Sequence, residues 1–276
     1  MKLTLGFSPC PNDTFIFDAL VHGRIDAEGL EFSYHLADVE ELNREAFTGE
    51  PDITKMSCFA YGFAAGNYLI LDSGSAIGYK NGPLLISRRK IDMDKMADAR
   101  IAIPGNHTTA NMLFSIAWPE AKNKKEYVFS DIEDVLLNDE ADAGLIIHET
   151  RFSYFRKGLI RLADMGQYWE RQTGLPIPLG IIAVNRRVSA EIAFKVNRII
   201  RRSLEYALND AMPAFDFVRD NAQDMDSSVM NNHIKLYVNK FTLDLGVEGR
   251  RAITELYRIA GEKKLIPEIP DRIFLT

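Results

Sequence analysis

The chain has 276 residues, a length that suits two lobes better than one compact core. Hydrophobic residues make up 46% and charged residues 26%, and the net charge of −6 gives no electrostatic support to a nucleic-acid partner. No run approaches the ~20 apolar residues of a membrane-spanning helix, so we expect no membrane insertion.

Strand and helix patterns alternate over the first 88 residues. Apolar runs bounded by turn residues predict strands at 2–7, 30–36, 52–56, 68–71 and 83–87. Helical spacing of apolar residues predicts helices at 15–21, 38–47 and 58–65. The second of these helices begins at Asp38, and Glu41 three residues later completes a capping-box pattern.

The same alternation restarts after residue 90. It predicts strands at 100–103, 127–129, 143–147, 159–163 and 177–184, and helices at 108–117, 130–138 and 189–209. The pattern is typical of an α/β protein with mixed or parallel sheets. We expect two chain crossings, with residues 1–88 and 186–276 in a larger lobe and residues 89–185 in a smaller one. A ligand cleft is expected between the lobes, beyond the carboxyl ends of the strands.

Three loops share one layout, in which a strand is followed by small polar residues and then by the start of a helix. They lie at residues 8–14, 54–58 and 105–110. A helix N-terminus offers unpaired N–H groups to a carboxylate or a phosphate, so converging loops of this kind predict a site for an acidic ligand. The alternative is that the polar residues only cap their own helices. No Walker phosphate loop is present in the sequence.

His148 follows the apolar run at 144–147, at the predicted end of a strand. A neutral imidazole in that position can take a proton near neutral pH, which makes His148 a candidate general base. The alternative is a structural histidine with satisfied hydrogen bonds. His107 lies in a candidate ligand loop and is a rival base, whereas His233 lies in a helical stretch without polar companions. No histidine spacing indicates a metal site.

Cys10 lies between Pro9 and Pro11, directly after the first predicted strand. The prolines fix the backbone on both sides and predict a rigid wall of the cleft, with Asn12 or Asp13 capping the following helix. A nucleophilic thiol would need a base such as His148, and no thiol-protease motif surrounds the cysteine. The N-terminal stretch lacks a signal peptide's apolar region, so we expect a cytoplasmic protein with reduced cysteines.

Five segments together carry a resemblance to a known family. They are GFSPCPNDTFIFDALVHGRID at 6–26, TKMS at 54–57, PGNHTTA at 104–110, AGLIIHE at 143–149 and YVNKFTLDLG at 237–246. In this order, they resemble the dihydroxynaphthoate synthases of the futalosine route to menaquinone. The resemblance covers nearly the whole chain and implies a two-lobed, periplasmic-binding-protein-like (type II) fold with a ligand cleft between the lobes.

The resemblance also implies an activity and a set of site residues. It implies a lyase that converts cyclic dehypoxanthinyl futalosine, a small-molecule carboxylate, to 1,4-dihydroxy-6-naphthoate and dihydroxyacetone, without metal or organic cofactor. The family's catalytic histidine matches His148, and its substrate-contacting residues match Lys55, Met56, Ser57, Thr109 and Ala110. The competing interpretation is a non-catalytic two-lobed protein that binds or senses a small molecule. The sequence leaves the oligomeric state open.

Overall fold

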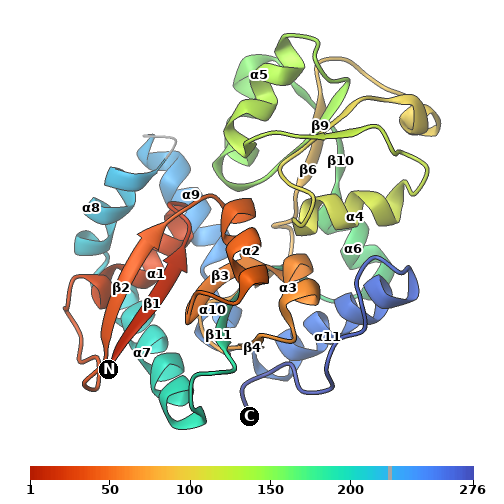
Figure 1. The fold of residues 1–276 in the computed structure, drawn as a ribbon. Helices are drawn as coiled ribbons and strands as arrows, with labels where there is room; N and C mark the ends of the chain where they lie inside the picture. The colour runs from red at the N-terminus through yellow and green to blue at the C-terminus, as the bar shows by residue number, and fades with distance from the viewer. Residues whose placement is uncertain (223–225) are drawn as a thin grey trace.

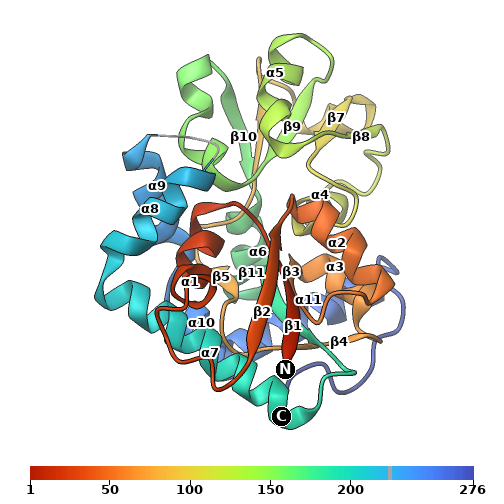
Figure 2. The same cartoon turned by 60° about the vertical axis from the view of Figure 1, so that its left-hand side comes forward.

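The computed structural model describes residues 1–222 and 226–276, which form two α/β lobes, each built on its own sheet (Figures 1 and 2). The larger lobe holds a sheet of order β2-β1-β3-β11-β4, in which β5 also pairs with β11. Strand β1 runs parallel to β2 and β3, whereas β11 runs antiparallel to its three partners. These strands are β1 (Lys2–Phe7), β2 (Glu31–Leu36), β3 (Ile53–Ser57), β4 (Tyr68–Ile70), β5 (Ala76–Gly78) and β11 (Ile177–Asn185).

Helices cover both faces of this sheet. One face carries α1 (Pro11–Val21) and α7 (Ala190–Asn209), and α8 (Ala211–Asn221) packs against these two helices. Helix α9 (Ser227–Tyr237) packs against α1, and both α9 and α10 (Lys240–Leu243) lie near β5. The other face carries α2 (Val39–Thr48), α3 (Cys58–Ala64) and α11 (Gly246–Glu262). Helix α7 forms as its apolar spacing predicts, and the Ser189 side chain caps it by accepting from the backbone N–H of Ile192 at 3.4 Å.

The smaller lobe has a sheet of order β10-β6-β9-β7-β8. Its strands are β6 (Leu84–Ser87), β7 (Ile101–Ile103), β8 (Lys124–Glu126), β9 (Ala143–Ile146) and β10 (Ile160–Asp164). Its helices are α4 (Thr109–Ala117), α5 (Ile132–Leu137) and α6 (Met165–Thr173), with 3-10 turns η1 (Met93–Asp98), η2 (Phe129–Asp131), η3 (His148–Phe152) and η4 (Tyr154–Lys157). Within the described ranges, no helix combines the length and apolar character needed to cross a bilayer.

Two strands belong to a different lobe from the one we expected. Strand β6 belongs to the smaller lobe's sheet, and β11 belongs to the larger lobe's sheet. The chain therefore crosses between β5 and β6 and again between β10 and β11. The two crossings meet at Gly82 and Gly166, where a Cβ atom on Gly82 would lie 2.2 Å from the backbone nitrogen of Gly166. Only glycine permits this approach of two backbones.

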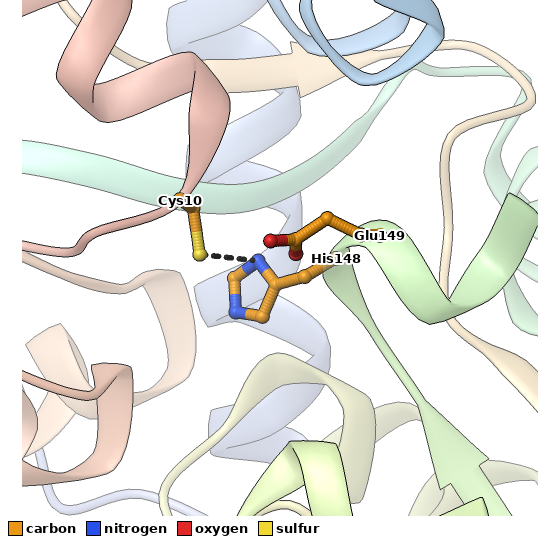
Figure 3. Close-up of side chains that lie close together, drawn as sticks. All are labelled: Cys10, His148 and Glu149. Atoms are coloured by element: carbon orange, nitrogen blue, oxygen red, sulfur yellow. Dashed lines mark hydrogen bonds between the residues drawn. The ribbon is translucent and has the colours of Figure 1, made fainter. Parts of the chain in front are cut away.

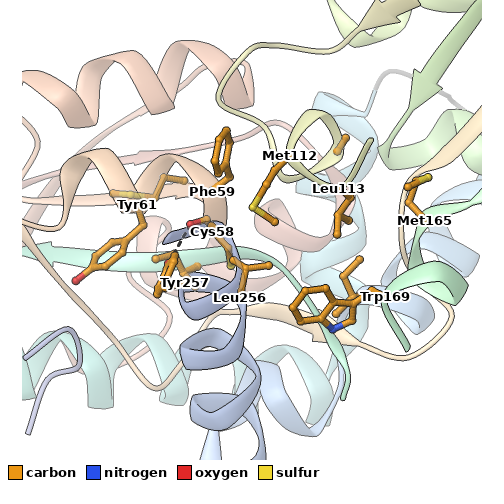
Figure 4. Packing of buried hydrophobic residues seen from close by; sticks show 14 of the residues in the cluster. Cys58, Phe59, Tyr61, Met112, Leu113, Met165, Trp169, Leu256 and Tyr257 are labelled. Carbon is orange, nitrogen blue, oxygen red and sulfur yellow. Dashed lines mark hydrogen bonds between the residues drawn. The ribbon is translucent and has the colours of Figure 1, made fainter. Parts of the chain in front are cut away.

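A continuous apolar core joins the lobes on the α11 side of the molecule (Figure 4). It brings together Phe59 and Tyr61 of α3, Met112 and Leu113 of α4, Met165 and Trp169 of α6, and Leu256 and Tyr257 of α11. The Tyr257 hydroxyl donates a buried hydrogen bond of 2.9 Å to the carbonyl of Cys58. This packing sets the relative position of α3 and α4, whose N-termini face the cleft from opposite lobes.

Local predictions failed where tertiary pairing or backbone capping decided the outcome. The strand predicted at 127–129 is wrong, because the edge strand β8 forms at Lys124–Glu126, where it pairs with β7 despite its charged sequence. Helix α1 begins at Pro11 with Cys10 as its N-cap residue, so the prediction that Asn12 or Asp13 caps it is also wrong. Strand β5 and helix α6 were not predicted.

Candidate active site

A cavity between the lobes brings together all three polar loops predicted from the sequence. Its volume is about 660 Å³, counting the part open to solvent, which is within the usual range for small-molecule sites. The larger lobe contributes Ser8, Asn12, Asp13, Lys55, Met56 and Ser57 to its wall, and the smaller lobe contributes Thr108, Thr109, Ala110 and His148. All six residues that the resemblance implied for the site therefore line one cavity.

Asp13 forms the centre of a buried polar network at the start of α1. Its carboxylate accepts from Lys55 Nζ at 2.5 Å, from Ser8 Oγ at 2.7 Å and from Asn12 Nδ2 at 2.7 Å. The Lys55 and Asp13 side chains are both nearly inaccessible to solvent, so each charge is balanced by the other. Gly180 makes room for the lysine, because a Cβ atom there would lie 2.9 Å from Lys55 Cε.

Ser57 is held in place by Asn43 of α2. The backbone N–H of Ser57 donates to Asn43 Oδ1 at 2.8 Å, and Ser57 Oγ accepts from Asn43 Nδ2 at 3.2 Å. Since the hydroxyl accepts in this contact, its own proton remains available for a ligand. The side chain of the preceding residue, Met56, is fully buried in the apolar core.

The N-terminus of α4 faces the cavity from the smaller lobe. Thr108 is its N-cap residue, and its side chain accepts from the backbone N–H of Asn111. The Thr109 hydroxyl donates to the carbonyl of Leu179 in β11 at 3.0 Å and accepts from the N–H of Phe59 in α3 at 3.3 Å, which ties the lobes together. Its single proton is therefore used, but the backbone N–H groups of Thr109 and Ala110 have no acceptor within the helix.

His148 follows β9 and has a strained backbone. Its φ of 56° lies in the left-handed region, which is uncommon for residues other than glycine and is concentrated at functional sites. Its ring packs edge-on against Phe129 at a centroid distance of 4.8 Å, and its Nδ1 lies 3.2 Å from Cys10 Sγ (Figure 3). The buried Nε2 has no hydrogen-bond partner among the residues described.

Burial keeps both members of the Cys10–His148 contact neutral. Desolvation lowers the pKa of His148 to about 4, although Asp38 and Asp13 oppose this shift. Desolvation, together with the negative charges of Glu149 and Asp13, raises the pKa of the Cys10 thiol well above its ordinary value. A thiolate–imidazolium pair of the kind that cysteine nucleophiles use is therefore disfavoured, and His148 is left as an uncharged base.

Three donor atoms near this contact have a spacing that could hold a metal ion. Within the described chain, ligand atoms of Cys10, His148 and Glu149 all lie within 4.8 Å of one another (Figure 3). Sequence spacing could not predict this group, because Cys10 and His148 are 138 residues apart. Ligation would require a thiolate, and burial opposes its formation at Cys10.

The structure separates the two candidate bases and adds two residues that the sequence did not indicate. His107 does not line the cavity, and its Nδ1 lies 2.8 Å from Glu40 Oε1. Asn81 and His233 do line the cavity, although neither belongs to a predicted ligand loop. Both side-chain polar atoms of Asn81 and Nδ1 of His233 are buried without partners in the part of the chain that is described. Buried polar atoms of this kind indicate positions where a ligand completes the hydrogen bonding.

Two α/β lobes with a cavity between them, lined by both polar and apolar side chains, define a periplasmic-binding-protein-like protein. Solved structures agree with this class: the alkanesulfonate-binding protein SsuA from Xanthomonas axonopodis pv. citri gives a TM-score of 0.73 at 13% identity, covering 99% of this chain and 96% of that one. At this identity, the likeness concerns the fold alone. A protein from Archaeoglobus fulgidus gives a TM-score of 0.91 at 32% identity, covering 96% of this chain and 98% of that one.

The sequence comparisons define the family more narrowly. A family model described as menaquinone biosynthesis matches residues 3–262. The 1,4-dihydroxy-6-naphthoate synthase of Thermus thermophilus is 41% identical, with 99% of each chain covered. That of Streptomyces coelicolor is 39% identical, with 98% of this chain and 97% of the relative covered. This chain therefore belongs to the menaquinone-biosynthesis family, as the sequence motifs predicted.

Proposed function

We propose that this protein is a 1,4-dihydroxy-6-naphthoate synthase, a carbon–carbon lyase that uses His148 as a general base. Its proposed substrate is cyclic dehypoxanthinyl futalosine, and the second product is dihydroxyacetone. Two relatives named as 1,4-dihydroxy-6-naphthoate synthases support the naphthoate product. The observation that carries the residue assignment is the neutral His148, which lines the inter-lobe cavity and has an unpartnered Nε2 within the described residues.

The substrate carboxylate is proposed to bind at the N-terminus of α4. The unpaired N–H groups of Thr109 and Ala110 and the positive end of the helix dipole favour an anion there. Ser57 supplies a hydroxyl donor from the other lobe. Lys55 retains donors beyond the one used by Asp13, and its charge is already balanced by that ion pair.

In the proposed reaction, His148 Nε2 removes a proton from the substrate. To accept this proton, Nε2 must have a free lone pair, so the single N–H proton of the neutral ring must be on Nδ1. Cys10 Sγ lies 3.2 Å from Nδ1. The carbon–carbon bond to the sugar-derived fragment then breaks as the naphthalene ring becomes aromatic. The proton held by His148 returns to the products as the fragment leaves as dihydroxyacetone, which restores the neutral base. Aromatisation of the ring supplies driving force for the cleavage.

A turnover assay tests this function against a non-catalytic binding protein. Purified protein is incubated with cyclic dehypoxanthinyl futalosine, and chromatography measures 1,4-dihydroxy-6-naphthoate and dihydroxyacetone as they form. Equal amounts of both products at a catalytic rate are the expected result. Tight binding of the substrate without product formation would contradict the lyase assignment and favour the binding protein that the fold alone also permits.

A further inference from the structure

His233 lies beside His148 in the wall of the cavity and has no role in the reaction proposed above. It belongs to α9 in the larger lobe and is 1% exposed. Its ring is nearly parallel to that of His148, with an interplanar angle of 18° and a centroid distance of 6.3 Å, and it also packs against Tyr237. A buried and a half-buried histidine from different lobes therefore face one cavity.

A chain of hydrogen bonds fixes which nitrogen of His233 carries its proton. The Asp13 carboxylate can only accept, so the Asn12 amide nitrogen donates to it at 2.7 Å. That contact turns Asn12 Oδ1 toward His233 Nε2, which lies 2.8 Å away and must donate. Burial and the neighbouring His148 hold the pKa of His233 well below its ordinary value, so the ring is neutral. Its Nδ1 is therefore a lone-pair acceptor.

This acceptor is unsatisfied in the protein itself. Nδ1 of His233 is buried without a hydrogen-bond partner in the described ranges, on a side chain that lines the cavity. A buried acceptor without a donor is unfavourable, and a bound ligand that supplies a donor removes the penalty. A lone pair repels a carboxylate oxygen and attracts a hydroxyl proton, so the chemistry selects a hydroxyl group.

We propose that His233 Nδ1 accepts a hydrogen bond from a hydroxyl on the naphthalene ring of the bound ligand, and so determines specificity for the hydroxylated compound. The inference rests on the proposed function. It orients the ligand between an anion-binding end at α4 and a hydroxyl-binding end at α9. Asn12 and Asp13 are positioning residues for His233 in this arrangement, because their hydrogen bonds set which of its nitrogens carries the proton.

A matched pair of variants separates the two nitrogens of His233. His233→Gln can place its amide nitrogen near the position of Nε2 and retain the donor to Asn12, while the acceptor at Nδ1 is lost. His233→Asn can place its amide oxygen near the position of Nδ1, while the contact with Asn12 is lost. The first variant tests the proposed hydrogen bond, and the second controls for the loss of the imidazole ring.

The probes are 1,4-dihydroxy-6-naphthoate and 2-naphthoate, which share the ring and the carboxylate but differ in the hydroxyls. Anaerobic fluorescence titration measures their affinities for the full-length protein. We expect the wild type to prefer the dihydroxy compound by about tenfold or more. His233→Gln should bind both within about twofold, with its affinity for 2-naphthoate unchanged, and His233→Asn should retain part of the preference. An undiminished preference in His233→Gln overturns the inference.

A measurement on the wild type keeps the proposal testable if His233→Gln fails to fold. In protein labelled with ¹⁵N-histidine, Nδ1 of His233 should be unprotonated and should shift when 1,4-dihydroxy-6-naphthoate is added, but not with 2-naphthoate. A protonated Nδ1, or equal shifts with both probes, overturns the inference. Absence of turnover by the wild type would instead contradict the proposed function, so the two failures are distinguishable.

Discussion

Two histidines follow neighbouring strands of the smaller lobe, and their surroundings differ in every respect that matters for proton transfer. His107 comes after β7, is about a third exposed, and has the Glu40 carboxylate beside its Nδ1 at 2.8 Å. His148 comes after β9, lies in the wall of the cavity, and has the Cys10 sulfur beside its Nδ1 at 3.2 Å. The two histidines therefore have the same position after a strand, but His107 has a carboxylate as its neighbour and His148 has a thiol.

The difference indicates how a fold selects one histidine as a base. His107 does not line the cavity, and the Glu40 carboxylate lies beside its Nδ1 at 2.8 Å. His148 lines the cavity beside a neutral thiol, and burial holds the pKa of His148 at about 4. The second nitrogen of His148 also lacks a partner among the described residues, so it can reach a ligand in the cavity.

The largest expected effect is on turnover when each histidine is replaced by asparagine. His148→Asn should reduce kcat by ~10²–10⁴-fold and leave substrate affinity within a few-fold, because a general base contributes to the transition state alone. His107→Asn should retain kcat within about twofold. Steady-state kinetics with cyclic dehypoxanthinyl futalosine measures both values.

The matched pair also controls for damage to the fold. Thermal unfolding followed by circular dichroism should show a cooperative transition for both variants. Near-normal turnover by folded His148→Asn would remove that residue from the reaction. A large loss of kcat in folded His107→Asn would show that His107 also contributes to turnover.

Local sequence patterns predicted many of the elements but not how they assemble. Apolar runs predicted β1 and β9, and Ser189 with its following apolar spacing predicted α7, because strand alternation and helix capping are local properties. The sheets that β6 and β11 join were not predictable, since pairing depends on partners far away in the chain. Charged β8 is a strand for the same reason.

The site shows the same division between local and long-range information. Motif resemblance indicated His148 and the two ligand loops at 55–57 and 109–110, and these residues line one cavity. His233 could not be found from the sequence, because its partner Asn12 is 221 residues away and α9 has no spacing that marks the contact. Asn12 and Asp13 fit a cap pattern, yet their side chains belong to the cavity network.

Replacing the group beside His148 tests a smaller part of the contrast. Cys10→Ser and Cys10→Ala keep the site free of added charge, so His148 should remain neutral. We expect kcat to fall by at most ~10-fold, the effect of losing one neutral hydrogen bond that orients the ring. Steady-state kinetics measures it, with Cys58→Ser as the control for loss of a buried thiol outside the cavity wall. A Cys10→Ala variant that folds but is inactive would show that the Cys10 thiol is required for the reaction.

The smallest expected effect is a weak dependence of activity on acid pH. A base must be unprotonated, and a pKa lowered to about 4 keeps ~90% of His148 unprotonated at pH 5. An ordinary histidine pKa of ~6.5 would leave only ~3%. The value of kcat/KM at pH 5 should therefore stay within about twofold of its value at pH 7, and should fall at lower pH with an apparent pKa near 4.

The profile of kcat/KM reports groups of the free enzyme, which is the state the structure describes. His107→Asn should give the same acid limb, because the half-buried histidine beside Glu40 takes no part in the proposed proton transfer. An acid limb near pH 6.5 that disappears in His107→Asn would reverse the roles of the two histidines. An acid limb near pH 6.5 in both proteins would mean instead that His148 is solvated when the base acts, since desolvation is the main cause of its lowered pKa.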